Sequence, residues 1–154
     1  MRMMGGVWFA NFVVFYLVAV VGSSPARKKV YIEGYVSCVY CVMEGGPGSV
    51  IKTDLLPGAV VKLQCNNRKK GSWEEQTETG GDGEFSFKPV KVTSWGAHKC
   101  KIFLVSSPRA VCPVIIYGEG VLFKPAAING NATSPFQLYT VRPLAFYPPP
   151  YTCV

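Results

Sequence analysis

Cys38 and Cys41 are separated by two residues, a spacing used in redox catalysis and in half of many zinc sites. A thioredoxin-type site needs a helix N-terminus to lower the pKa of its thiol, whereas we expect this pair at the end of a strand, before the glycine-rich segment 44–48. A zinc site would need two further ligands, and the chain has one histidine, His98, and no second pair with this spacing. The pair is therefore predicted to form structural disulfides with distant partners, with no metal and no cofactor.

The acidic residues show no catalytic pattern either. A serine-type triad would need a nucleophile and an orienting carboxylate beside His98, and the sequence places neither there. Glu74 and Glu75 are adjacent, so on a strand they would point to opposite faces and could not act as a glycosidase pair. A carboxylate pair assembled from distant strands stays open, because the fold sets such pairs. We expect a protein that is not an enzyme.

The first residues have the features of a secretory signal peptide. Arg2 supplies the positive charge, the segment 7–21 is apolar apart from Asn11, and the small residues of 22–26 suit signal peptidase. The alternative is an uncleaved membrane anchor, but the apolar run is shorter than the ~20 residues that span a bilayer. We expect residues 1–26 to be the leader, cut between 22 and 26, and residues 27–154 to be one domain with no stable membrane span.

All six cysteines follow this leader, and an even number in an exported chain predicts a disulfide framework. Six cysteines allow 15 complete pairings, and spacing alone does not choose among them. Asn131 begins the sequence Asn-Ala-Thr, an acceptor for N-glycosylation in the secretory pathway. We therefore expect an extracellular glycoprotein that contains disulfides.

Two clusters of basic residues, 27–29 and 68–70, contribute to a formal net charge of +7, or +6 without Arg2. For an exported chain we expect acidic polysaccharide or a membrane surface as the polyanion, and no nucleic acid. The alternative is that both clusters are ordinary solvated surface. The predicted polyanion site consists of Arg68, Lys69 and Lys70, with Trp73 as the aromatic residue expected to be most exposed.

Short runs rich in Val, Tyr, Phe and Thr, separated by Pro and Gly, are typical of an antiparallel β-sandwich or barrel. We expect an all-β domain of about seven strands, with 74–79 at a sheet edge and a tight hairpin at 80–83. The runs that predict strands are 30–38, 59–65, 74–79, 84–88, 100–105, 114–117, 121–123 and 136–141. Cys38, Cys65 and Cys100 are each in phase with the apolar face of their run, so we expect their sulfur atoms in the core.

Several segments together resemble the plant pollen Ole e I allergen and extensin family. Residues 33–41 resemble its E-G-x-V-x-C-x-x-C opening, 57–65 its second block and 79–87 its T-x-x-x-G-x-F block. Cys100 and Cys112 are similar to its fourth and fifth cysteines, and 143–146 resembles its closing motif before Cys153. Within the opening, Val39, Tyr40 and Val42 replace the Asp, Thr and Arg of the best-known version. The long proline-rich region that some cell-wall members of the family carry is absent, and the short tail 147–151 is the only extensin-like segment in this sequence.

The resemblance implies three disulfides in a non-catalytic β domain: Cys38–Cys112, Cys41–Cys153 and Cys65–Cys100. It also implies a secreted protein of the plant cell wall that binds acidic, pectic polysaccharide. The alternative is a secreted ligand or inhibitor that binds another extracellular protein, such as a receptor or a hydrolase.

Overall fold

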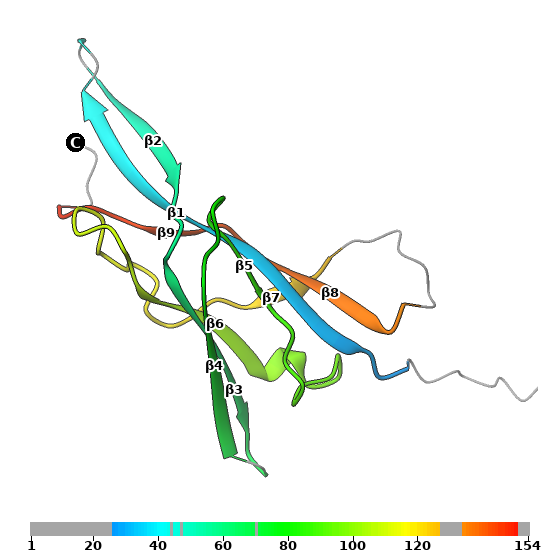
Figure 1. The fold of residues 1–154 in the computed structure, drawn as a ribbon. Coiled ribbons are helices and arrows are strands. Elements are labelled where there is room, and N and C mark those ends of the chain that lie inside the picture. The colour runs from blue at the N-terminus through cyan, green and yellow to red at the C-terminus, as the bar shows by residue number, and fades with distance from the viewer. Residues whose placement is uncertain (1–25, 44, 47, 70, 127–133, 151–154) are drawn as a thin grey trace, which may run out of the picture.

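The structure is a computed structural model that describes residues 26–43, 45–46, 48–69, 71–126 and 134–150. These residues form two β-sheets and one short 3₁₀ turn (Figure 1). The elements are β1 (Lys29–Met43), β2 (Ser49–Leu55), β3 (Val60–Asn67), β4 (Gly71–Glu78), β5 (Glu84–Phe87), η1 (Ala97–Lys99), β6 (Cys100–Ser106), β7 (Phe123–Pro125), β8 (Phe136–Val141) and β9 (Leu144–Phe146). The predicted all-β class is confirmed.

Strand β1 organises the larger, six-stranded sheet. The first half of β1 pairs with β5 and β8, and the second half pairs with β2 and β9. Val30, Ile32, Val36 and Cys38 are buried along its length, which is the two-residue alternation expected of a strand with one face in the core. The strand is longer than the predicted run 30–38 and continues through Cys41.

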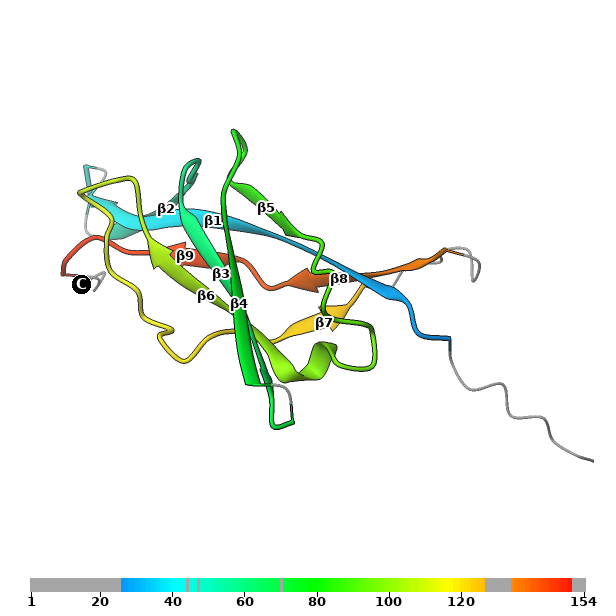
Figure 2. The same ribbon diagram turned by 60° about the horizontal axis from the view of Figure 1, so that its bottom comes forward.

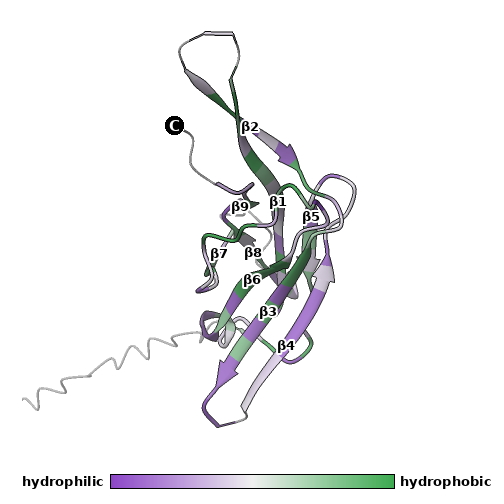
Figure 3. Ribbon diagram, turned by 90° about the vertical axis from the view of Figure 1, so that its left-hand side faces the viewer, coloured by the Kyte–Doolittle hydropathy of each residue, from purple (hydrophilic) through white to green (hydrophobic). Residues whose placement is uncertain are grey.

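The smaller sheet has the order β4-β3-β6. Val61, Leu63 and Cys65 of β3 and Ile102 of β6 are buried, whereas β4 is hydrophilic and lies at the edge (Figure 3). The predicted polar edge strand is therefore confirmed. This sheet crosses over the long strand β1 (Figure 2), and buried side chains from both sheets form one hydrophobic core. The described strands do not close into a barrel.

Three details of the predicted strands are wrong. The structure has nine strands in its described part, because β2 and β9 were not expected and the run 114–117 forms only a bridge from Val114 to Tyr147. Pairing is not all antiparallel, since β1 is parallel to both β8 and β9. The segment 80–83 is not a hairpin: β4 pairs with β3 and β5 pairs with β1, so this turn carries the chain from one sheet to the other. Long connections allow parallel pairing, and local turn signals do not reveal which strand is the partner.

Close packing explains two glycines of the recognised motifs. A Cβ atom on Gly34 would lie 2.6 Å from the ring of Phe85, so the absence of a side chain on β1 makes room for that ring. Gly83 has a φ of +68°, and its Cβ would lie 2.6 Å from the carbonyl oxygen of Val36. The backbone of Gly83 is held there because its carbonyl accepts a hydrogen bond from the Val36 N–H at 2.8 Å.

The threonine that begins the third motif has a structural role of the same kind. The Thr79 hydroxyl donates to the Leu56 carbonyl at 2.5 Å and accepts from the Ala59 N–H at 2.9 Å. It is buried, and it fixes the turn that leads into β3. Thr79 and Gly83 thus hold in place the two connections, 56–59 and 79–83, that carry the chain between the sheets.

Two of the implied disulfides, Cys38–Cys112 and Cys65–Cys100, are present. Cys38, Cys65 and Cys100 are all buried, as their phase predicted. The third pair, Cys41–Cys153, stays a prediction because Cys153 lies outside the described residues. The expected leader, most of which is residues 1–25, and the acceptor Asn131 also lie outside them. No helix in the described residues is long and apolar enough to cross a membrane.

Candidate functional site

The predicted basic residues lie where β3 turns into β4. Arg68 and Lys69 are exposed in this connection, and the Lys69 N–H donates to the Asn67 side-chain oxygen at 3.0 Å, which tightens the turn. Lys99, from η1, joins them because Cys100 pairs directly with Cys65. Together these cations and two asparagines line a hollow of about 420 Å³, which we call the hairpin hollow: Asn66, Asn67, Arg68, Lys69 and Lys99.

Trp73, the other described residue of the predicted site, does not line this hollow. Lys70 lies outside the described residues. Trp73 was expected to be the most exposed aromatic, and that prediction is wrong: its ring is half-buried and packs against the core. Trp73 lies opposite Cys65 in the β3–β4 register, and directly paired residues share a face, so the tryptophan faces inward with the cysteine. Tyr35 and Trp95 are more exposed.

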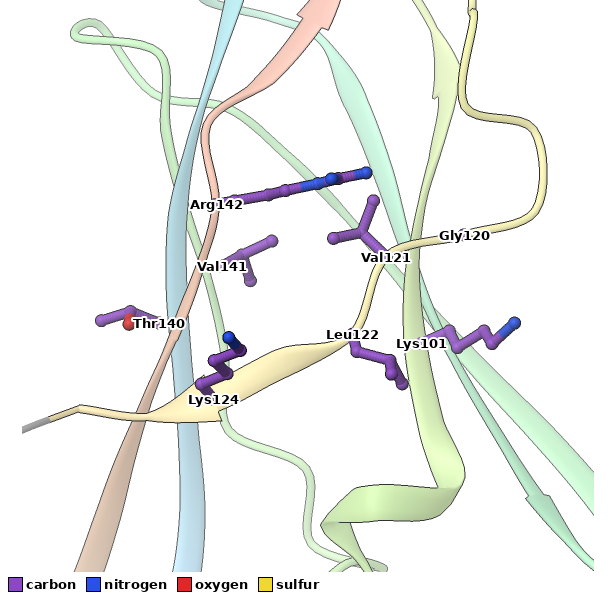
Figure 4. Close-up of a pocket in the computed structure, with 8 residues that line it drawn as sticks. All are labelled: Lys101, Gly120, Val121, Leu122, Lys124, Thr140, Val141 and Arg142. Carbon is purple, nitrogen blue, oxygen red and sulfur yellow. The ribbon is translucent and has the colours of Figure 1, made fainter.

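A second basic site was not predicted from the sequence, because its residues are far apart in the chain. It is a groove of about 590 Å³ between β6, β7 and β8, shown in Figure 4. Lys101, Lys124 and Arg142 provide its charge. Apolar and small residues provide the rest of its lining: Gly120, Val121, Leu122, Thr140 and Val141. Figure 4 shows the Arg142 side chain extending across the groove toward the segment of Gly120 and Val121.

Strand pairing assembles this groove. Lys124 of β7 pairs with Thr140 of β8 in antiparallel register, and a single bridge joins Val121 to Ile102 of β6. Val121 and Val141 are buried, so the floor of the groove is part of the core surface. No signal in the sequence joins Lys101 to Arg142, because neither lies in a charged run.

Two of the groove cations are oriented by neighbours. The Arg142 guanidinium lies 4.7 Å from the centre of the Tyr117 ring, a cation–π distance that restrains the side chain while leaving its N–H groups available. Lys101 Nζ donates to the carbonyl oxygen of Glu119 at 3.2 Å. In the described part of the chain, no Asp or Glu lines the groove or the hairpin hollow. Both sites are therefore suited to an anion.

Two carboxylates in the described residues form ion pairs with basic side chains. Asp54 accepts from Arg109 Nη1 at 3.1 Å and from the Tyr40 hydroxyl at 3.1 Å, and these hydrogen bonds lower the pKa of Asp54 from its ordinary value. Glu74 pairs with Lys62 at 3.3 Å. His98 is exposed. Within the described residues, no three His, Cys, Asp or Glu side chains are grouped so that they could hold a metal ion.

Comparison with known proteins gives three informative similarities. The chain is 37% identical over 87 residues to a pistil-specific extensin-like protein of Nicotiana tabacum, a match that covers 56% of this chain and 20% of that protein. It is 31% identical over 132 residues to non-classical arabinogalactan protein 30 of Arabidopsis thaliana, covering 79% of this chain and 54% of that protein. This chain thus spans about a fifth and about half of these two relatives.

Among solved structures, the major plantain pollen allergen Pla l 1 has the same fold, with a TM-score of 0.53 and 25% identity. The alignment covers 80% of this chain and 95% of that one. No family model matches the sequence.

Proposed function

The chain is related to the pollen Ole e I-type allergens and to extensin-like and arabinogalactan proteins of plants, and from this relationship we propose that it is a secreted, non-enzymatic protein of the plant cell wall that binds acidic polysaccharide. The relatives support the wall-associated part of this proposal. The ligand is inferred from this chain's own surface: its partner is a pectic polymer whose sugar units carry carboxylates.

The hairpin hollow is the observation that supports an acidic polysaccharide as the ligand. Arg68, Lys69 and Lys99 bring three cations from two chain segments to one concave surface, and none of the described residues that line it is acidic. An exposed ion pair contributes only ~0–1 kcal/mol, so one contact would not retain a polymer. A polymer that bears many carboxylates meets several cations at once, and binding then gains from multivalency. The net charge of the domain adds attraction that salt screens beyond ~8 Å at physiological ionic strength.

Retention of the secreted protein on immobilised, de-esterified pectin tests this proposal. We expect elution by increasing salt and little retention on fully methyl-esterified pectin, because esterification removes the carboxylates. The double variant Arg68→Ala/Lys69→Ala should elute at lower salt. The matched control is Lys88→Ala/Lys91→Ala, which removes the same charge at two exposed lysines that line neither hollow described above.

Equal retention on both pectins, or an equal loss in both double variants, would refute a carboxylate site at the hairpin. Failure of the wild type to be retained on de-esterified pectin would refute the proposed ligand altogether.

The runner-up function is binding to another extracellular protein, and one structural feature favours it. In the described part of the six-stranded sheet, β2 is an edge strand (Figure 1). Three apolar side chains of the β1–β2 hairpin are exposed, those of Met43, Val50 and Ile51. Apolar side chains on an unpaired edge suit protein contacts more than contacts with a charged polymer. A stoichiometric complex that survives high salt would favour this alternative.

A further inference from the structure

A third, smaller hollow of about 90 Å³ lies between the hairpin hollow and the groove. It shares Asn66 and Lys99 with the hairpin hollow, and Lys101 and Leu122 with the groove. Its other lining residues are Gln64, His98 and Phe103. The middle hollow is therefore adjacent in space to both of the others, and each depression shares side chains with the next.

We propose that these three depressions form one continuous basic track, which binds a linear polyuronate along its length, with Arg142 as a carboxylate-binding residue at the groove end. This inference rests on the proposed function and extends it from a local charge cluster to an elongated site. The cations of the basic track are Arg68, Lys69, Lys99, Lys101, Lys124 and Arg142.

The charge of the basic track is of one sign. Among the described residues, no Asp or Glu lines any of its three parts. Glu119 at the groove contributes its backbone carbonyl to hold Lys101. Glu74, which lies opposite Gln64 in the β3–β4 register, is paired with Lys62. A ligand with one carboxylate could satisfy only one end of such a surface. A polymer with a carboxylate on every sugar presents charges at regular intervals and can meet cations from several strands at once.

The neutral part of the lining favours a sugar acid over a bare anion. Val121 and Val141 form the apolar floor of the groove, and the exposed Leu122 side chain lines both the groove and the middle hollow. Such surfaces pack against the C–H face of a sugar ring while cations meet its carboxylate. The planar guanidinium of Arg142, held beside Tyr117, can donate two parallel N–H bonds to one carboxylate.

An elongated site predicts that affinity depends on ligand length. A single uronic acid occupies one part of the basic track and binds weakly. Each added unit that reaches a further cation increases affinity, until the oligomer fills the track and further units add little. A site confined to the hairpin hollow would reach its full affinity with a short oligomer.

Calorimetry with galacturonic acid and oligogalacturonides of 3, 6 and 10 units tests the length dependence on the secreted full chain. The informative variants are Lys124→Ala/Arg142→Ala at the groove end and Arg68→Ala/Lys69→Ala at the hairpin end, with Lys88→Ala/Lys91→Ala as the charge-matched control. We expect either end variant to weaken binding of the 10-unit oligomer about tenfold, and binding of the 3-unit oligomer far less, because the trimer can use the other end.

Arg142→Lys should recover only part of the affinity, since lysine keeps the charge but loses the paired donors. Thermal melting of each variant confirms that it is folded.

If the wild type bound the 3-unit and the 10-unit oligogalacturonides with the same affinity, the proposal of one continuous basic track would be refuted. It would also be refuted by a groove variant that binds the 10-unit oligomer like the wild type while the hairpin variant fails, and this result would leave the proposed function intact. Absence of binding to every oligomer and to de-esterified pectin would instead overturn both. A sulfated polysaccharide that binds more tightly than polygalacturonate of equal length would show a general polyanion site and refute the assignment to uronates.

Discussion

Cys65 and Cys100 lie directly opposite each other on the neighbouring strands β3 and β6, with their Cα atoms 4.0 Å apart and their sulfurs joined. Arg68 follows Cys65 by three residues, and Lys99 immediately precedes Cys100. The disulfide therefore fixes the two chain segments that supply the hairpin hollow. It links the stability of the smaller sheet to the placement of the proposed binding cations.

Loss of this disulfide should strongly reduce secretion. The two cysteines are 35 residues apart in the sequence. In the chain-entropy model, closing a loop of this length stabilises the folded state by about 4 kcal/mol, a large share of the ~5–15 kcal/mol of a small domain. We expect Cys65→Ser, Cys100→Ser and the double variant all to be secreted poorly, with the double variant no worse than the singles because it leaves no unpaired thiol. Quantifying monomer in the medium of a secreting host measures this effect.

Peptide mapping of the wild-type protein is the control for that experiment. It should yield Cys65 joined to Cys100, and Cys38 joined to Cys112. Cys41 joined to Cys153 is the expected third bridge. Efficient secretion of a monomeric single variant would show that the bridge is not needed for folding.

Replacing Gly83 with alanine should destabilise the fold by about 1–3 kcal/mol. The new Cβ would lie 2.6 Å from the Val36 carbonyl oxygen and 2.9 Å from the Leu56 nitrogen, and these two atoms are hydrogen-bonded to each other at 2.9 Å. Gly81→Ala is the matched control, because nothing lies within 4 Å of its Cβ position. Thermal or denaturant unfolding of the two variants should separate them clearly. Equal stability would contradict the close approach of this turn to β1.

The Asp54–Arg109 pair should make a small, pH-dependent contribution to stability. The folded-state pKa of Asp54 is lowered, first by its hydrogen bond with Arg109 and then by that with Tyr40. Its stabilising effect is therefore fully present above the ordinary carboxyl pKa of 3.8 and is lost as the pH falls through the lower folded value. In melting curves between pH 6 and pH 2, Asp54→Asn should lose less stability on acidification than the wild type.

Arg109→Ala should flatten the same pH profile, and combining it with Asp54→Asn should add little. The effect should also shrink in high salt, because both side chains are exposed. Unchanged pH profiles in both single variants would show that the pair does not contribute.

The mature protein should lack the first 22 to 26 residues and carry a glycan on Asn131. The short apolar segment followed by small residues predicts the cleavage, and the Asn-Ala-Thr sequence predicts the glycan once the chain enters the secretory pathway. Intact-mass and peptide mass spectrometry of protein from the producing tissue measure both. A mature chain that begins at Met1 contradicts the first expectation, and fully unmodified Asn131 contradicts the second.

Local pattern was enough to predict the features that depend on side-chain alternation. The inward phase of Cys38, Cys65 and Cys100 follows from period-two geometry, and the structure confirms it. The run 136–141 coincides with β8, because its bounds are set by short-range turn and strand signals. The glycines and the threonine in the motifs also identified the fold correctly, since each meets a packing demand that few other residues can meet.

Only the tertiary structure decided which strands are neighbours and which distant side chains meet. The turn at 80–83 has the same glycines whether its strands pair with each other or separate, as β4 and β5 do. Trp73 turned inward because its partner in the register is the buried Cys65. Lys101, Lys124 and Arg142 share a groove only because β7 and β8 pair and Val121 bridges to β6. Sequence alone thus determined the strand alternation and the inward phase of the cysteines, because these depend on near neighbours in the chain. Long-range strand pairing assembled the charged surface, because its residues are joined by no local signal.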